Sequence, residues 1–301
     1  MLRIFTIIHP LVDACSVSVL VAGGATWERV LVYNALAFAL QLPMGMLLDE
    51  WPRCGRSGFF AGTVLVLAAA IVAALGWGGW GVLSAACVGN ALFHLTAGKH
   101  ILETWEGRAG PIGLFISTGA LGLMAGQVWA AKAAALSLTV FAVALAVCVG
   151  LAAVRGWESD GRMKARAQDD GAALGSLLIL VGLFALIAWR SWAGLFASGR
   201  SAGGCALMML AGAVVTFAGK VAGGYLAERI GRWKVTVFSL MGSVVLAFFC
   251  EPAWAAAWLA LLFVAQLATG PVLSLVYDKS DRRGGFAFGF NCLGLFAGSF
   301  A

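Results

Sequence analysis

Two pairs of polar side chains stand four residues apart inside long apolar stretches of the chain. The first pair is His9 and Asp13, and the second is Asn90 and His94. Residues four apart share one face of a helix, so each pair presents both groups to the same neighbour. Histidine and aspartate side chains can take up and release a proton. The spacing therefore predicts a proton-binding site between helices; the alternative is a neutral hydrogen-bonded pair that locks the first helix against its neighbours.

The surrounding composition indicates that lipid is the solvent of this chain. Of the 301 residues, 61% are hydrophobic and 11% are charged, whereas a soluble domain carries about 25% charged residues. Apolar stretches of roughly 18–25 residues recur throughout, the length that crosses about 30 Å of hydrocarbon. Because a backbone in lipid must satisfy its own hydrogen bonds, the spans should be helices. We expect an all-α integral membrane protein whose dispersed basic residues do not point to nucleic acid.

We expect eleven membrane spans, with a twelfth absent. A first span that contains His9 and Asp13 is too long and too polar for a removable signal peptide. The expected spans are 3–22, 27–48, 57–76, 79–99, 110–130, 134–153, 173–192, 202–223, 234–250, 253–276 and 284–301.

Single polar residues in or near these spans have more than one interpretation. Lys99 could attract an anionic solute, or it could extend its amine to the membrane surface. Lys220 could bind an anion, pair with an acid or reach the surface in the same way, and Arg190 is expected at the outer membrane interface. Gln266 and Asn291 could line a path or join two helices by a hydrogen bond, and Asn291 is a candidate for the pocket.

The sequence does not predict a metal site, a cofactor or an enzyme. His94 and His100 are six residues apart and so lie on different helix faces, and no H-E-x-x-H motif occurs. The seven cysteines are scattered singly and fit plain packing better than a disulfide framework. A membrane-embedded hydrolase that uses His9, Asp13 and His94 would lack a nucleophile signature.

The basic residues predict the orientation. With a cytoplasmic N-terminus, fifteen Lys and Arg residues fall in cytoplasmic loops and four in outer loops. This asymmetry follows the rule that positive charge stays on the cytoplasmic side. We therefore expect the N-terminus in the cytoplasm.

A short loop motif occurs twice, after the second and the eighth span. Its copies are 45–56 and 224–232, and a second repeat relates 121–126 to 293–298. A motif that recurs six spans later indicates a duplicated bundle, and duplicated membrane bundles usually move solutes. We expect an N-terminal six-helix bundle at 1–154, a cytoplasmic linker at 155–172 and an incomplete five-helix bundle at 173–301.

Both loops resemble the signature of the major facilitator superfamily, an acidic residue after a glycine, followed by further glycine and arginine. Within that superfamily, His9 with Asp13, the segment from Gly89 to His94, and Asp49-Glu50-Trp51-Pro52 are most similar to fosmidomycin-resistance-type exporters. That subgroup continues its Phe-His with Pro-Glu, and here Leu95-Thr96 follows instead. The residues that carry the loop signature are Gly45, Asp49, Arg53 and Arg56 in the first copy, and Gly224, Glu228, Arg229, Gly231 and Arg232 in the second.

The acidic residues of the two loops should bind the ends of other helices. Asp49 and Glu228 lie at the C-terminal, negative ends of their own helices, where a carboxylate is unfavourable. The positive N-terminus of the last span, near Gly284, is the natural partner for Asp49. The N-terminus of the fifth span, at Gly110-Pro111, is the natural partner for Glu228. The resemblance implies that these loops latch the two halves together on the cytoplasmic side.

The resemblance implies a major-facilitator-like two-bundle fold and a secondary active transporter. We expect proton-coupled efflux of a small anionic or amphiphilic compound by alternating access, with His9, Asp13, Asn90, His94, Lys99 and Asn291 in the proton and substrate site. The alternatives are an uptake symporter or uniporter, and a non-transporting sensor or assembly module of the same fold. The partners would be the solute, protons and the lipid of a bacterial cytoplasmic (inner) membrane, and the chain would be a monomer.

Overall fold

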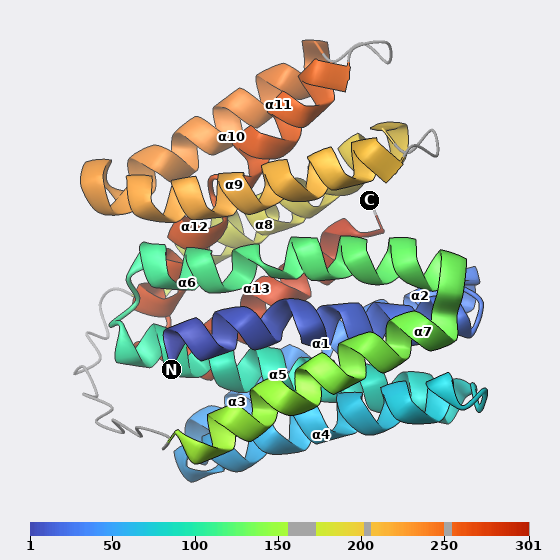
Figure 1. Ribbon diagram of the computed structural model, residues 1–301. Coiled ribbons are helices and arrows are strands. Elements are labelled where there is room, and N and C mark those ends of the chain that lie inside the picture. Colours follow the sequence, from blue (N-terminus) through green and yellow to red (C-terminus); the bar gives the residue numbers. More distant parts are fainter. Residues whose placement is uncertain (156–172, 202–205, 250–254, 301) are drawn as a thin grey trace.

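The computed structural model describes residues 1–155, 173–201, 206–249 and 255–300. Within these ranges the regular structure is helical throughout (Figure 1). The helices are α1 (Leu2–Ala22), α2 (Trp27–Asn34), the π-helix η1 (Ala35–Ala39), α3 (Gln41–Glu50), the 3-10 helix η2 (Pro52–Cys54), α4 (Gly55–Ala74), α5 (Trp80–Thr104), α6 (Ala109–Ser117), α7 (Gly119–Val154), α8 (Ala173–Ser201), α9 (Ala206–Ile230), α10 (Arg232–Phe249), α11 (Ala255–Gln266), α12 (Thr269–Lys279) and α13 (Gly284–Gly298).

The expected membrane spans are present in the described part of the chain. Nine segments there are long and apolar enough to cross a membrane. One of them, Ala109–Val154, has 46 residues, about twice the length of one crossing. It loses helical geometry at Ala133 (φ −154°, ψ 73°), where Figure 1 shows the chain turning back. If that segment counts as two crossings and the shorter apolar helix α13 as one more, the helices account for the eleven expected spans. The expected linker at 155–172 lies outside the described residues except for Arg155.

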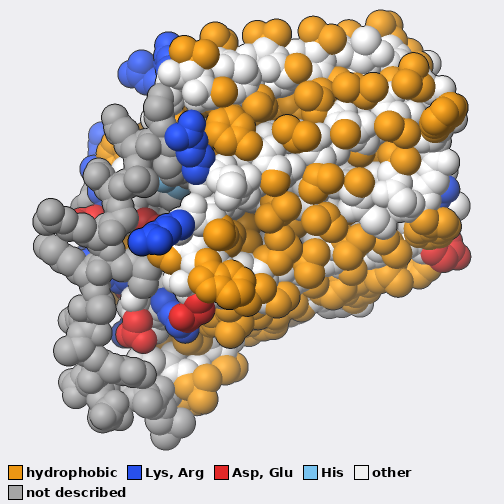
Figure 2. Space-filling view, turned by 90° about the horizontal axis from the view of Figure 1, so that it is seen from below, with side chains coloured by type: hydrophobic (Ala, Val, Ile, Leu, Met, Phe, Trp, Pro, Cys, Tyr) orange, Lys and Arg blue, Asp and Glu red, His pale blue; other side chains and the backbone are white. Residues whose placement is uncertain are grey.

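The side chains are distributed as a lipid solvent requires. Hydrophobic side chains cover the long sides of the bundle, and the visible Lys and Arg side chains gather mainly at one end (Figure 2). Large apolar residues such as Val147 and Leu151 are 57% and 61% exposed on α7. This surface would be unfavourable in water and is suited to hydrocarbon chains.

The N-terminal and C-terminal helices meet through two long contacts. In Figure 1, α1 to α7 occupy the lower part of the molecule and α8 to α12 the upper part, with α13 between them. Helix α13 packs along α3, and α6 packs along α9. The two repeated loops follow α3 and α9, so both lie at the same end of the bundle, which we call the loop end.

Glycine allows the closest helix contact, between α1 and α7. A Cβ atom at Gly122 would overlap the backbone of Pro10, and one at Gly126 would lie 2.6 Å from the Ala14 carbonyl oxygen. Small residues permit this approach of two backbones in a membrane. The contact holds α1 firmly, and α1 carries His9 and Asp13.

We predict that Gly122→Val destabilises the protein and that Gly150→Val on the same helix does not. The valine at 122 would push against the Pro10 backbone, whereas nothing lies within 4 Å of a Cβ at Gly150. Overpacking of this kind typically costs about 1–3 kcal/mol. Unfolding of the two variants in detergent measures the difference, and equal stability would contradict the predicted backbone contact.

Candidate functional site

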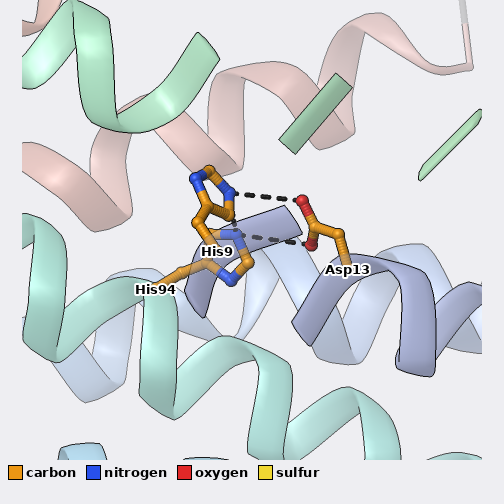
Figure 3. A group of neighbouring side chains, drawn as sticks. All are labelled: His9, Asp13 and His94. Carbon is orange, nitrogen blue, oxygen red and sulfur yellow. Dashed lines mark hydrogen bonds and ion pairs between the residues drawn. The ribbon is translucent and has the colours of Figure 1, made fainter. Parts of the chain in front are cut away.

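His9, Asp13 and His94 form a buried polar cluster, as Figure 3 shows. The Nε2 atoms of His9 and His94 are 2.6 Å apart. The Asp13 carboxylate faces the Nε2 edge of both rings, with Oδ2 3.2 Å from His9 Nε2 and Oδ1 3.4 Å from His94 Nε2. Asn90 donates from Nδ2 to Asp13 Oδ1 at 2.9 Å. The four residues that the sequence singled out on the first and fourth spans are therefore in mutual contact.

The other ring nitrogens define where hydrogens lie in this cluster. His9 Nδ1 is 2.7 Å from the Phe115 carbonyl oxygen, and His94 Nδ1 is 2.8 Å from the Asn90 carbonyl oxygen. A carbonyl oxygen can only accept, so each Nδ1 carries a hydrogen and donates it. If both rings were neutral, neither Nε2 atom would carry a hydrogen. Two lone pairs would then face each other across the 2.6 Å between the Nε2 atoms, next to a carboxylate. One further proton between the two Nε2 atoms removes this repulsion and supplies the positive charge that Asp13 requires.

A break between two helices supplies one of these carbonyl groups. Helix α6 ends at Ser117 and α7 begins at Gly119, so carbonyl groups just before the break lose their intrahelical partners. The Phe115 carbonyl accepts from His9, and the Phe115 ring stacks on the His9 ring at 4.6 Å. Gly119 at the start of α7 packs directly against the cluster. A side chain would not fit at this position, because a Cβ atom there would lie 2.5 Å from Asp13 Oδ2. Broken helices of this type form the solute sites of many transporters.

The same three side chains could each offer one ligand atom to a metal ion, since these atoms lie within 4.8 Å of one another. Two nitrogens bound at 2.0–2.1 Å to a tetrahedral zinc ion would be separated by about 3.3 Å. The observed 2.6 Å separation of the two Nε2 atoms is instead a hydrogen-bond distance. The geometry fits a shared proton better than a metal ion.

Asn291 belongs to a second polar group, centred on Arg190. The Arg190 guanidinium donates to Gln266 Oε1 at 3.1 Å, to Thr269 Oγ1 at 2.9 Å and to Asn291 Oδ1 at 3.4 Å. Arg190 is only 3% exposed, so its expected place at the membrane interface is wrong. The reason is the length of α8, which continues to Ser201 and leaves Arg190 inside the helix.

Lys99 lies with the first repeated loop rather than with the histidines. Its Nζ is 2.6 Å from Asp49 Oδ1, and it also binds the Glu103 carboxylate. Asp49 in turn accepts from the backbone N–H groups of Gly285 at 2.8 Å and Phe286 at 2.7 Å. The predicted contact of Asp49 with the N-terminus of the last span is thus present. Lys99 is a buried part of this contact and does not extend its amine to the membrane surface.

The second repeated loop makes the matching contact. Glu228 accepts from the Gly110 N–H at 2.9 Å, at the start of α6 as expected, and from Arg108 Nη2 at 2.7 Å. The hydrogen bond and charge of Glu228 raise the pKa of the exposed Arg108 guanidinium. Each acidic residue therefore binds the positive end of a helix from the other half of the chain.

The remaining residues of the loop signature have different environments. Gly45 and Gly224 lie at close helix crossings, where a Cβ would overlap Gly285 in the first case and lie 2.6 Å from the Ala109 carbonyl oxygen in the second. Gly231 has a φ of +102°, which favours glycine. Arg232 pairs with Asp278 at 2.7 Å. Of the arginines in the loop signature, Arg53, Arg56 and Arg229 are exposed.

Sequence reasoning missed three partners of these groups. Ser16 lies 3.4 Å from Asn90 Nδ2, Glu103 binds Lys99, and Thr269 accepts from Arg190. Isolated hydroxyl groups are common in membrane helices, so Ser16 carried no signal. Thr269 precedes Gly270-Pro271 inside a span, and this pair of helix breakers could have indicated the gap between α11 and α12.

Comparison with known proteins identifies the fold. No protein-family model matches the sequence, and no curated protein matches it. Among solved structures, the chain is similar to the E. coli fucose:proton symporter FucP, with a TM-score of 0.68 and 12% identity, covering 99% of this chain and 88% of that one. A second structure, of the major facilitator superfamily transporter FucP in the outward conformation, gives a TM-score of 0.63 and 14% identity over 98% and 89% of the two chains.

These similarities show that the chain has the all-α fold of major facilitator superfamily transporters, which confirms the expected fold class. It is an integral, multi-pass membrane protein by its apolar helices and by this fold. At such low identity the solute of the neighbours does not transfer to this chain, so the function has to be argued from the side chains described above.

We predict that two adjacent carboxylates of the first loop differ strongly in their contribution to stability. Asp49→Asn leaves Lys99 buried with one acidic partner fewer, and breaking a buried ion pair in this way costs about 3–5 kcal/mol. Glu50→Gln breaks a pair with Arg283 whose side chains are 65% and 44% exposed, and exposed pairs contribute about 0.2–1 kcal/mol. Denaturation of both variants in detergent tests this, and a similar loss in the two would contradict the structural role of Asp49.

Proposed function

We propose that the protein is a proton-coupled secondary transporter whose proton site is the cluster of His9, Asp13 and His94. The observation that supports this most directly is the 2.6 Å contact between the two Nε2 atoms when both Nδ1 atoms already donate to carbonyl groups. The cluster is stable only while it holds one extra proton. When that proton leaves, two lone pairs and an uncompensated carboxylate face one another, so the side chains must separate.

Loss of the proton would be transmitted to the contact between the halves. His9 binds the Phe115 carbonyl in the last turn of α6, just before the break between α6 and α7. In the same turn, Lys220 of α9 donates to the Ile116 carbonyl at 3.2 Å. A change in the protonated cluster thus acts on the segment where α9 is attached, and rocking of one bundle against the other would follow.

The two loop contacts would be the conformational latch of this cycle. Asp49 and Glu228 each hold the N-terminus of a helix from the other half of the chain. These bonds close the loop end, and they have to break for that end to open. In the proposed orientation the N-terminus and the loop end face the cytoplasm of a bacterial inner membrane, and the chain works as a monomer.

The sequence resemblance favours efflux of a small anionic or amphiphilic compound, whereas one of the two structural neighbours is named a fucose:proton symporter. Vesicles with known protein orientation and an acid exterior distinguish the two directions. An exporter that exchanges the compound for protons would expel a preloaded compound, and a symporter would accumulate it.

We predict that Asp13→Asn abolishes proton movement. The asparagine removes the charge that keeps a proton on the histidine pair. Purified protein in liposomes that contain a pH-sensitive dye is offered a panel of small organic anions and amphiphilic drugs. For any compound that drives proton flux through the unchanged protein, the variant should lose at least about 100-fold in rate, the lower end of the contribution of a positioned proton-transfer group.

Glu28→Gln is the matched control, because Glu28 is an exposed carboxylate in the first turn of α2. It should keep the full proton flux, and both variants should retain the melting behaviour of a folded protein. An unchanged flux in folded Asp13→Asn would contradict the proton site and would favour the neutral, locking interpretation of the cluster.

A further inference from the structure

Within the residues that the structure describes, Arg190 is a buried cation without an acidic partner. Its three hydrogen bonds go to the neutral side chains of Gln266, Thr269 and Asn291. Its Nε atom is buried and has no hydrogen-bond partner. A guanidinium is strongly destabilised by burial unless an anion accompanies it. The C-terminal half therefore holds a buried positive charge that no acidic side chain among the described residues balances.

Lys220, which is partly buried, is a second cation without an acidic partner among the described residues. Its only hydrogen bond among the described residues is to the Ile116 carbonyl oxygen, at 3.2 Å. Lys99 provides the comparison within this protein, because that buried amine contacts two carboxylates, Asp49 and Glu103. In the described part of the chain, neither Arg190 nor Lys220 takes part in an ion pair with an acidic residue.

The two cations lie near each other and near the proton site. Gly219, the residue before Lys220, packs against Gln266, because a Cβ atom at Gly219 would lie 3.0 Å from the Gln266 Cβ. Gln266 accepts the hydrogen bond of Arg190. Lys220 binds the carbonyl of Ile116, the residue directly after Phe115, whose carbonyl holds His9. Arg190 also lies at a helix break, because its partners Gln266 and Thr269 are the last residue of α11 and the first of α12.

The repeats of the sequence give Arg190 about the same place in the second half as Asp13 has in the first. The two repeated motifs are offset by 179 and 172 residues. Arg190 lies 177 residues after Asp13, and Gln266 lies 172 residues after His94, so both spacings fall within the range of the motifs. Where the first half carries a carboxylate with a histidine, the second half carries a guanidinium with an amide.

We propose that Arg190 and Lys220 bind the oxyanion group, a carboxylate or a phosphate, of a small solute between the two halves. The unpartnered Nε edge of the guanidinium suits the two oxygens of such a group, and the lysine amine adds a point charge. The inference rests on the proposed transport function and names the chemical class of its solute. Gln266, Thr269 and Asn291 then act as positioning residues that orient the guanidinium.

The test is ligand binding by the purified protein in detergent, which requires neither transport nor a proton gradient. Sodium benzoate and inorganic phosphate are the two anionic probes, glucose is the neutral control, and ionic strength is held constant. At least one anion should raise the melting temperature in a saturable way at concentrations up to roughly 100 mM, the range in which even a millimolar site becomes filled. The two arms distinguish a carboxylate from a phosphate site.

The variants Arg190→Gln and Lys220→Met should each weaken the apparent affinity for that anion by at least about tenfold. Lys132→Met is the matched control, because Lys132 is exposed, and it should bind like the unchanged protein. Without anion, Arg190→Gln should melt at the same temperature or higher, since an uncompensated buried charge has been removed. A purely structural role for Arg190 predicts the opposite, a lower melting temperature.

The proposal is overturned by any of three results: neither anion shifts the melting temperature, glucose shifts it equally, or the shift persists in both variants. If Arg190→Gln does not fold, Lys220→Met decides alone, because this lysine makes a single hydrogen bond, to a backbone carbonyl. Anion binding without Asp13-dependent proton flux would refute the proposed function and leave this site standing. Proton flux without anion binding would refute only the site.

Discussion

The contact between the Nε2 atoms of His9 and His94 constrains the centre of this molecule. Each ring has its Nδ1 hydrogen committed to a backbone carbonyl, of Phe115 in one case and Asn90 in the other. The two remaining nitrogens are 2.6 Å apart, and in the proposed function they share one proton whose charge balances Asp13. Three helices and the break before α7 meet at this contact, so the proposal expects gain or loss of that proton to change the packing between them.

Charge is handled differently at the loop end and at the centre. At the loop end, Asp49 and Glu228 are compensated by helix N-termini and by Lys99 or Arg108, which makes two closed contacts between the halves. At the centre, Arg190 and Lys220 have neutral or backbone partners only, within the described residues. In the proposed function this difference has a use. Ion pairs within the protein can stabilise one conformation, and binding of the solute to the unpaired cations can stabilise another.

Much of this arrangement could be predicted from the sequence, because the relevant signals are local. The four-residue spacing of His9 and Asp13 indicated a shared helix face, and the helix-end argument predicted the partners of Asp49 and Glu228. The environment of Arg190 could not be predicted, because it depends on where α8 ends and on a gap in another span. The partnership of Lys99 with Asp49 likewise joins two helices whose relative register only the folded bundle determines.

The most direct test of the central claim is nuclear magnetic resonance of protein labelled with nitrogen-15 in its histidines. The account predicts a scalar coupling between His9 Nε2 and His94 Nε2 through one shared, strongly deshielded hydrogen, with both Nδ1 atoms protonated. The coupling should vanish in Asp13→Asn and persist in Glu28→Gln. Two independent neutral rings in the unchanged protein, each with a bare Nε2 and no coupling between them, would contradict it.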